Sequence, residues 1–184
     1  MTNAELIAVT LDDLLDHEVS LIVYGRAALA LGFPNPPEEV ANSLDIDIIL
    51  PFLHIQTIAN DNQFWFAQQL LNSQLNSRGL YLTHIFQEDQ VFLRPEWKSH
   101  VRLILSPALR RLKLFHPDAI DLVLTKMMRG EDPQDLDDIR FLISSEGLTE
   151  AVMEHAFQLA RIPDSEEFRD AFNRALPHVR KMLA

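Results

Sequence analysis

In Leu21-Ile-Val-Tyr-Gly-Arg-Ala-Ala-Leu29, a short apolar run ends at a glycine and gives way to helix-forming residues. This order predicts a strand over 19–24, a turn at Gly25 and a helix that begins at Arg26. A second strand is predicted by Ser43-Leu-Asp-Ile-Asp-Ile-Ile-Leu50, in which acidic and apolar residues alternate. The chain therefore starts with the parts of an α/β sheet, and carboxylates lie on its second strand.

The acidic strand has a period of two, so its side chains divide between two faces. Asp45 and Asp47 should project together from one face. Leu44, Ile46 and Ile48 are expected on the other face, toward a core. Two neighbouring carboxylates repel each other unless a cation lies between them, and Mg²⁺ commonly uses one or two protein carboxylates together with water and phosphate oxygens. A strand end with two solvated acids is the alternative.

Composition narrows the class of protein. The chain has 184 residues, of which 47% are hydrophobic, and this is enough for one well-packed core with a small helical appendage. It contains no cysteine, so disulfides and thiolate metal sites are excluded, as expected for a cytoplasmic protein. A formal net charge of −11 argues against an extended nucleic-acid surface. No run of residues has the length and apolar character of a membrane span.

The remaining pattern predicts helices and strands in turn. We expect an amphipathic helix over 4–17, a proline-rich loop over 32–43, a helix over 60–77, a hairpin of 80–86 with 91–93, strands at 101–105 and 112–115, and helices from Pro117 onward. Gly130 should end the first of these late helices, and Asp132-Pro133 should begin the next. Pro163 and Pro177 should break the C-terminal helices.

One acidic residue of the late helices is expected to be buried. At helical spacing Asp135 falls within an apolar stripe, whereas Asp137 and Asp138 are expected to point away. A buried carboxylate needs a cationic partner. We therefore expect Asp135 to pair with Lys126 or Arg129.

Two segments together resemble a known superfamily. The first is Gly25 after an apolar strand, followed by Arg26-Ala-Ala-Leu, a proline-rich connection and Asp45-x-Asp47; the second runs from Leu124 to Ile139. They resemble the minimal nucleotidyltransferases, in particular small families related to the toxin-associated (AbiEii-like) nucleotidyltransferases. The resemblance implies a small mixed sheet flanked by helices over 1–116 and a helical C-terminal part over 117–184, packed on this core as one compact unit.

The resemblance also implies a reaction and a site. A nucleoside monophosphate would move from a nucleoside triphosphate to an acceptor, such as a protein or an RNA, with Asp45 and Asp47 as the Mg²⁺ ligands. Lys126 would join these two carboxylates as a catalytic residue in contact with phosphate. The nucleotide-binding residues implied are Gly25, Arg26, Ser43, Arg129 and Asp135.

Two departures from the family pattern keep a second function open. Arg26 stands where the family has a second small residue, and no acid occupies the later strand that usually supplies a third carboxylate. His84 lies on that strand, where a period of two places it among apolar neighbours as a core residue. Glu88 and Asp89 fall in the expected hairpin turn. The alternative is therefore a catalytically silent binding module of the same fold, for example one component of a toxin–antitoxin pair.

Overall fold

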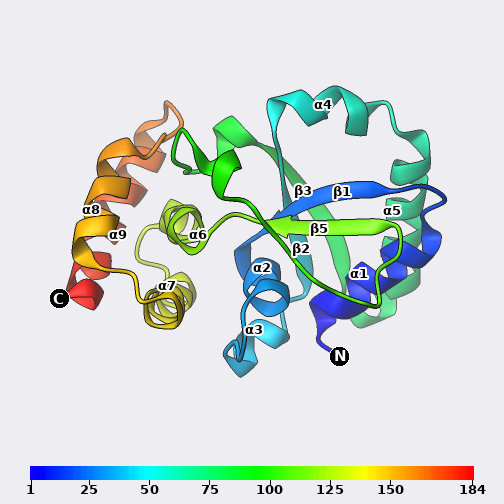
Figure 1. Cartoon of the computed structure of the whole chain (residues 1–184), viewed down its shortest axis with the longest axis horizontal. Helices are drawn as coiled ribbons and strands as arrows, with labels where there is room; N and C mark the ends of the chain where they lie inside the picture. Colours follow the sequence, from blue (N-terminus) through cyan, green and yellow to red (C-terminus); the bar gives the residue numbers. More distant parts are fainter. The chain divides into compact units, whose positions relative to one another are not determined.

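Figure 1 shows a computed structural model of the chain, and it describes residues 1–184. The chain divides into two compact units. Met1–Gln87 and Arg102–His116 form the first unit, and Glu88–Val101 and Pro117–Ala184 form the second. The segment 88–101, which we expected in the first part, thus belongs to the helical second unit. None of the helices combines the length and the apolar character that crossing a membrane requires.

The first unit contains a mixed five-stranded sheet with the order β3-β2-β1-β5-β4. Its strands are β1 (Val19–Tyr24), β2 (Asp45–Leu50), β3 (Tyr81–Gln87), β4 (Arg102–Leu103) and β5 (Leu112–His116). Strand β1 pairs antiparallel with β2 and parallel with β5, while β3 is parallel to β2. The expected α+β architecture, a small mixed sheet flanked by helices, is confirmed.

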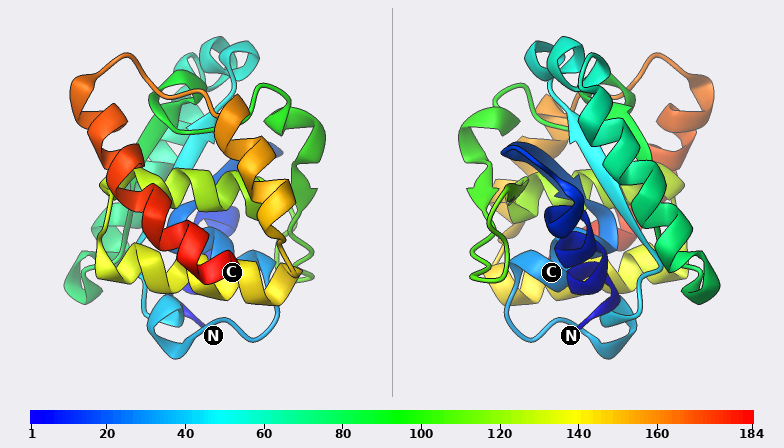
Figure 2. Two further views of the ribbon diagram at one scale, coloured as in Figure 1. Left: turned by 90° about the vertical axis from the view of Figure 1, so that its left-hand side faces the viewer. Right: turned by 90° about the vertical axis from the view of Figure 1, so that its right-hand side faces the viewer.

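Helices cover one face of this sheet. The helices of the first unit are α1 (Asn3–Leu14), α2 (Gly25–Gly32), α3 (Glu38–Ala41), α4 (Phe52–Ala59) and α5 (Asn62–Leu75), followed by the short 3₁₀ helix η1 (Asn76–Arg78). Helices α1 and α5 pack against each other over the sheet (Figure 2, right), and α2 contacts α1 and β1. Ile46 and Ile48 are buried as expected, but Leu44 lies before the strand and is exposed.

The pairing of β2 with β3 is irregular at one point. Ile46 pairs with Leu82 and Ile48 pairs with Ile85, so the single residue Asp47 lies opposite two residues of β3. This is a β-bulge, which carries one extra residue on one strand and changes the direction of its side chains. Beyond the bulge, every β3 side chain lies on the opposite face from the one that a strict period of two predicts.

Strand β3 forms one edge of the sheet, and side chains from α5 complete its hydrogen bonding at Leu82. The Leu82 N–H donates to Asn72 Oδ1 at 2.8 Å, and the Leu82 carbonyl accepts from Asn72 Nδ2 at 3.0 Å. Gln68 Nε2 donates to the same carbonyl at 2.7 Å. The primary amide of Asn72 thus takes the place of a neighbouring strand.

A buried carboxylate holds the chain just before β5. Asp12, on α1, is 1% exposed, and its Oδ1 accepts from the N–H groups of Arg110, Arg111 and Leu112 at 2.8, 2.7 and 2.7 Å. Burial raises the pKa of Asp12, but these backbone hydrogen bonds outweigh it, and the pKa is lowered overall. Asp12 therefore joins α1 to the start of β5 as a carboxylate.

The second unit is helical. It contains the short 3₁₀ helices η2 (Glu88–Gln90), η3 (Trp97–His100) and η4 (Met127–Arg129) and the helices α6 (Ala119–Lys126), α7 (Pro133–Glu146), α8 (Glu150–Leu159) and α9 (Glu166–Leu183). The left view of Figure 2 shows α6 to α9 packed against one another, with α9 crossing over α6 and α7. Phe92 lies in this core, edge-on to Phe168 and Phe172. Arg94 is buried there and binds Asp118 and Asp121.

Several expected elements were wrong. Residues 88–90 form a 3₁₀ turn, and 91–93 form no hairpin strand; Leu93 makes an isolated bridge with Arg161. The strand expected at 101–105 is reduced to β4. Pro177 lies inside α9 and does not break it, because buried residues such as Phe172 and Val179 on either side of the proline hold the helix against the unit.

Candidate metal and nucleotide site

Asp45, Asp47 and His84 come together on the first unit. Each offers one ligand atom, and these atoms all lie within 4.8 Å of one another. Within the cluster, His84 Nδ1 lies 3.2 Å from Asp47 Oδ1. Both aspartates come from β2 and are half-buried, as the alternation of the strand predicts. The cluster contains two negative oxygen ligands and one imidazole nitrogen, a set that suits a divalent cation.

The expectation that His84 lies in the core is wrong. Its side chain is 60% exposed and lies beside Asp47. The cause is the β-bulge, which puts Thr83 and His84 together opposite Asp47 and so brings the imidazole to the carboxylate face. The ring stacks on Phe86 at a centroid distance of 5.6 Å, and Nδ1 lies 3.0 Å from the Thr83 hydroxyl.

Gly25 forms the next part of the site, where β1 turns into α2. Its φ of +64° lies in the left-handed region, where glycine carries no steric penalty. A Cβ at this position would lie 3.5 Å from Asp47 Oδ2, so the backbone passes close to the carboxylate. The N-cap residue of α2, Tyr24, makes no side-chain capping hydrogen bond. A helix N-terminus of this kind attracts phosphate through its N–H groups and its dipole.

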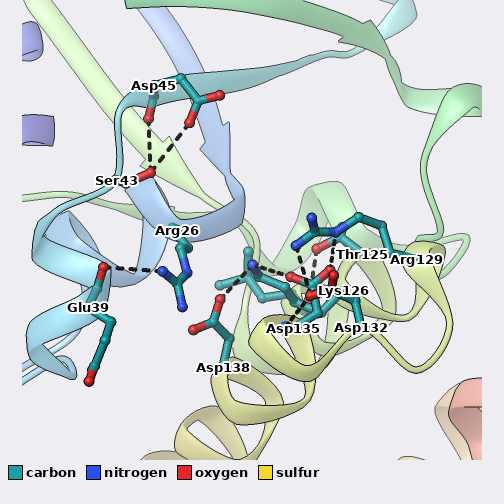
Figure 3. A network of polar contacts seen from close by, with 11 residues as sticks. Arg26, Glu39, Ser43, Asp45, Thr125, Lys126, Arg129, Asp132, Asp135 and Asp138 are labelled. Atoms are coloured by element: carbon teal, nitrogen blue, oxygen red, sulfur yellow. Dashed lines mark hydrogen bonds and ion pairs between the residues drawn. The ribbon is translucent and has the colours of Figure 1, made fainter. Parts of the chain in front are cut away.

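Two further residues belong to this part of the first unit (Figure 3). Ser43 lies two residues before the start of β2, and Arg26 lies in the first turn of α2. The Ser43 hydroxyl lies 3.4 Å from both the backbone oxygen and Oδ1 of Asp45, and it can donate its single hydrogen to either of them. Arg26 donates from Nη1 to the carbonyl of Glu39, on α3, at 3.2 Å. Ser43 thus lies against the Asp45 carboxylate, and Arg26 ties the start of α2 to α3.

The predicted pairing of Asp135 is confirmed, and both expected partners take part. Lys126 Nζ donates to Asp135 Oδ1 at 2.8 Å and to Asp138 Oδ2 at 2.7 Å, and Arg129 Nε donates to Asp135 Oδ2 (Figure 3). Burial raises the pKa of Asp135, but the Arg129 hydrogen bond and the Lys126 charge outweigh it, and the pKa is lowered overall. The network joins α6 and η4 to α7 within the second unit.

This network gives Lys126 a structural role. The residue is 6% exposed, and its ammonium group uses two of its three donors on carboxylates. Phosphate binding by Lys126, Arg129 or Asp135 therefore stays a prediction. Asp138, expected to point away, is 1% exposed and belongs to the network. The sequence carries a signal for this burial. Asp138 follows Asp135 by three residues, and residues at that spacing share a helix face.

The two acids of the expected turn, Glu88 and Asp89, belong to the second unit. Glu88, in the second unit, accepts from Trp97 Nε1 at 3.0 Å and from Lys98 Nζ at 3.1 and 3.0 Å. Asp89 is exposed in the same turn. Within the first unit, His84 therefore occupies the place beside the two aspartates.

Comparisons with protein-family models, with curated proteins and with solved structures find no match to this chain. Its function is therefore argued from the residues of the site.

Proposed function

We propose that this chain is a divalent-metal-dependent nucleotidyltransferase, which moves a nucleoside monophosphate from a nucleoside triphosphate to a protein or RNA acceptor. The observation that supports it is the close approach of Gly25 and the first turn of α2 to the Asp45, Asp47 and His84 cluster. A metal site and a phosphate-binding helix end are then adjacent. Triphosphate is supplied in the cytoplasm, where we place the protein.

Each part of the site has a task in this proposal. Asp45 and Asp47 would hold Mg²⁺, which would supply positive charge to the phosphates and to the leaving pyrophosphate. The N–H groups at the start of α2 bind the triphosphate, and Gly25 leaves room for it. The Ser43 hydroxyl, 3.4 Å from Asp45 Oδ1, would help to orient that carboxylate. Arg26, which lies in the first turn of α2, adds positive charge at this helix end.

The proposed transfer is a single displacement at the α-phosphorus. The acceptor hydroxyl oxygen forms a bond to this phosphorus, while the bond between the phosphorus and the bridging oxygen of pyrophosphate breaks. The acceptor proton passes to water, and pyrophosphate leaves with the bonding electron pair. No covalent bond to the protein is required, so the contribution of the side chains is positioning and charge neutralisation.

Transfer is tested with triphosphates labelled at the α-phosphate, incubated with the protein, Mg²⁺ and cell extract. We expect labelled macromolecules with wild type and none with the Asp45→Ala, Asp47→Ala double variant. Asp89→Ala is the matched control, because this acid is exposed and lies outside the cluster. Calorimetry should show that Mg²⁺ strengthens triphosphate binding in wild type and in Asp89→Ala, and not in the double variant. Equal binding by wild type and the double variant would reject the site.

One observation favours a second candidate, a binding module without catalysis. An imidazole, and not a third carboxylate, completes the cluster. Such a module would bind metal and triphosphate in the same place and act through a protein partner, as one component of a toxin–antitoxin pair could. Wild-type protein that binds metal and triphosphate, yet labels no acceptor in extract from any growth condition, would favour this candidate.

A further inference from the structure

We infer that His84 Nδ1 is the third protein ligand of the metal and that the site consequently selects Mn²⁺ over Mg²⁺. This inference rests on the proposed function in using the same two carboxylates. It adds the identity of the ion, because a pair of aspartates without the histidine would favour Mg²⁺.

The distances fit a shared ion. Neighbouring ligand atoms of an octahedral ion with bonds of about 2.1 Å lie about 3 Å apart. The 3.2 Å between His84 Nδ1 and Asp47 Oδ1 is close to this value. The candidate atom of Asp45 lies within 4.8 Å of both, so small side-chain rotations bring all three to one centre. Three protein ligands leave three positions of an octahedron for water or phosphate oxygens.

The backbone directs the imidazole to this position. In a regular strand, Ile48 would lie opposite His84; the bulge places Ile85 there and leaves His84 on the carboxylate face. Stacking on Phe86 holds the ring plane, and the Thr83 hydroxyl lies 3.0 Å from the same Nδ1. Bulges are common beside functional sites, where they turn a side chain toward a ligand. The nitrogen is thus held at the carboxylates before any ion binds.

The ligand set decides which ion binds best. Mg²⁺ prefers oxygen ligands and gives up its water reluctantly, whereas imidazole suits the first-row transition metals. Mn²⁺ takes carboxylate oxygens and water in an octahedral arrangement. As a divalent ion of the first transition row, it also binds imidazole nitrogen more strongly than Mg²⁺ does. Replacing an oxygen ligand by His84 therefore weakens Mg²⁺ binding and retains Mn²⁺ binding.

The test measures binding of each metal alone to the full chain by calorimetry. Wild type is compared with His84→Ala, with His84→Asp and with His54→Ala, which removes an exposed histidine on α4 and serves as the control. We expect His84→Ala to weaken Mn²⁺ binding by about tenfold or more, with a smaller effect on Mg²⁺. His84→Asp should reverse the preference, because it provides three carboxylates. Circular dichroism confirms that the variants fold.

Pulsed electron paramagnetic resonance gives a second readout that does not depend on activity. Bound Mn²⁺ should show coupling to a histidine nitrogen in wild type and in His54→Ala, and no coupling in His84→Ala. A wild-type spectrum without nitrogen coupling, or equal Mn²⁺ binding by wild type and His84→Ala, would overturn the inference.

The two proposals can fail separately. If Mg²⁺ and triphosphate bind together and label is transferred, but Mn²⁺ shows no nitrogen coupling, the inference is overturned and the proposed function stands. If nitrogen coupling and Mn²⁺ selectivity are found, but triphosphate neither binds nor changes the metal affinity, the inference stands and the proposed function fails.

Discussion

Gly25 lies against Asp47, so closely that a Cβ at position 25 would be 3.5 Å from Asp47 Oδ2. The turn that ends β1 therefore lies beside the acidic strand β2, and the backbone of Gly25 passes next to the Asp47 carboxylate. A side chain at position 25 would cover that side of the carboxylate. The glycine thus has a conformational role and a role in access, and the two roles can be measured separately.

Gly25→Ala should lower both stability and metal affinity. A non-glycine residue in the left-handed region costs about 1–2 kcal/mol. The new methyl group would also stand in van der Waals contact with Asp47 Oδ2, where it would cover part of the carboxylate. Gly79→Ala is the matched control, because Gly79 has a φ of +66° and nothing within 4 Å of the added Cβ. Urea unfolding should show similar losses for both variants. Calorimetry with Mn²⁺ should show weaker binding for Gly25→Ala alone, and equal weakening by both variants would contradict the role in access.

Asp135→Ala should destabilise the second unit strongly. Removing one partner of a buried ion pair commonly costs about 3–5 kcal/mol, since the remaining charge keeps its burial and loses its partner. Lys126 would be left with Asp138, and Arg129 would lose the carboxylate that its Nε binds. Asp137→Ala, on the same helix, removes an exposed pair with Arg140 and should cost about 1 kcal/mol or less. Equal unfolding midpoints for the two variants would contradict a buried network.

Asp12→Ala should likewise lower the free energy of unfolding of the first unit. Three consecutive backbone N–H groups would lose a charged acceptor, and hydrogen bonds to charged groups contribute about 1.5–3 kcal/mol each. Because such losses are not additive, we expect a total of about 3 kcal/mol or more. The neighbouring Asp13→Ala removes an exposed pair with Arg110 and should change the free energy of unfolding by less than about 1 kcal/mol. Denaturant titration compares the two.

His17 joins the end of α1 to the start of α5. Its Nδ1 lies 2.7 Å from Asp16 Oδ1, and its Nε2 lies 2.8 Å from Asp61 Oδ2. Hydrogen bonds to Asp16 and Asp61 raise the pKa of His17. Burial raises the pKa of Asp61, but the Phe64 N–H and His17 outweigh it, so that it is lowered. The two residues therefore carry opposite charges over a defined pH range.

The stability difference between wild type and His17→Gln should depend on pH with a definite sign. A raised histidine pKa adds stability below the unfolded value of about 6.5, and this is lost as pH rises through the folded value. The lowered pKa of Asp61 adds stability at pH values above its unfolded pKa of about 3.9. This stability is lost as the pH falls through the folded pKa. The difference should be largest between about pH 4 and 6.5 and, for an exposed pair, at most about 1 kcal/mol. His54→Gln should show no such maximum in thermal unfolding measured across this range.

The parts of the fold that follow from local pattern were predictable. The alternation of Asp45 and Asp47 with Ile46 and Ile48 gave the correct faces of β2, and Asp132 caps α7 where Asp132-Pro133 predicted a helix start. In each case the deciding contacts lie within a few residues of one another. Local propensity and period are then sufficient.

His84 shows why the rest was not predictable from sequence. The period of two is correct up to Leu82 and fails after it, because the register shift opposite Asp47 depends on how two distant strands pair. The sequence of residues 81–87 contains no signal that predicts the extra residue of the β-bulge. The strand expected at 91–93 failed for a related reason: Phe92 is buried among Phe168 and Phe172, which lie far along the chain. Tertiary packing decided both segments.

The amide of Asn72 has a consequence for the protein at high concentration. An open sheet edge is a template on which another chain can add a strand, and this is a common start of aggregation. At Leu82 both backbone groups are already bonded to Asn72, so an incoming strand would find neither a donor nor an acceptor there. Asn72 of α5 therefore blocks the pairing of a strand from a neighbouring molecule with β3 at Leu82.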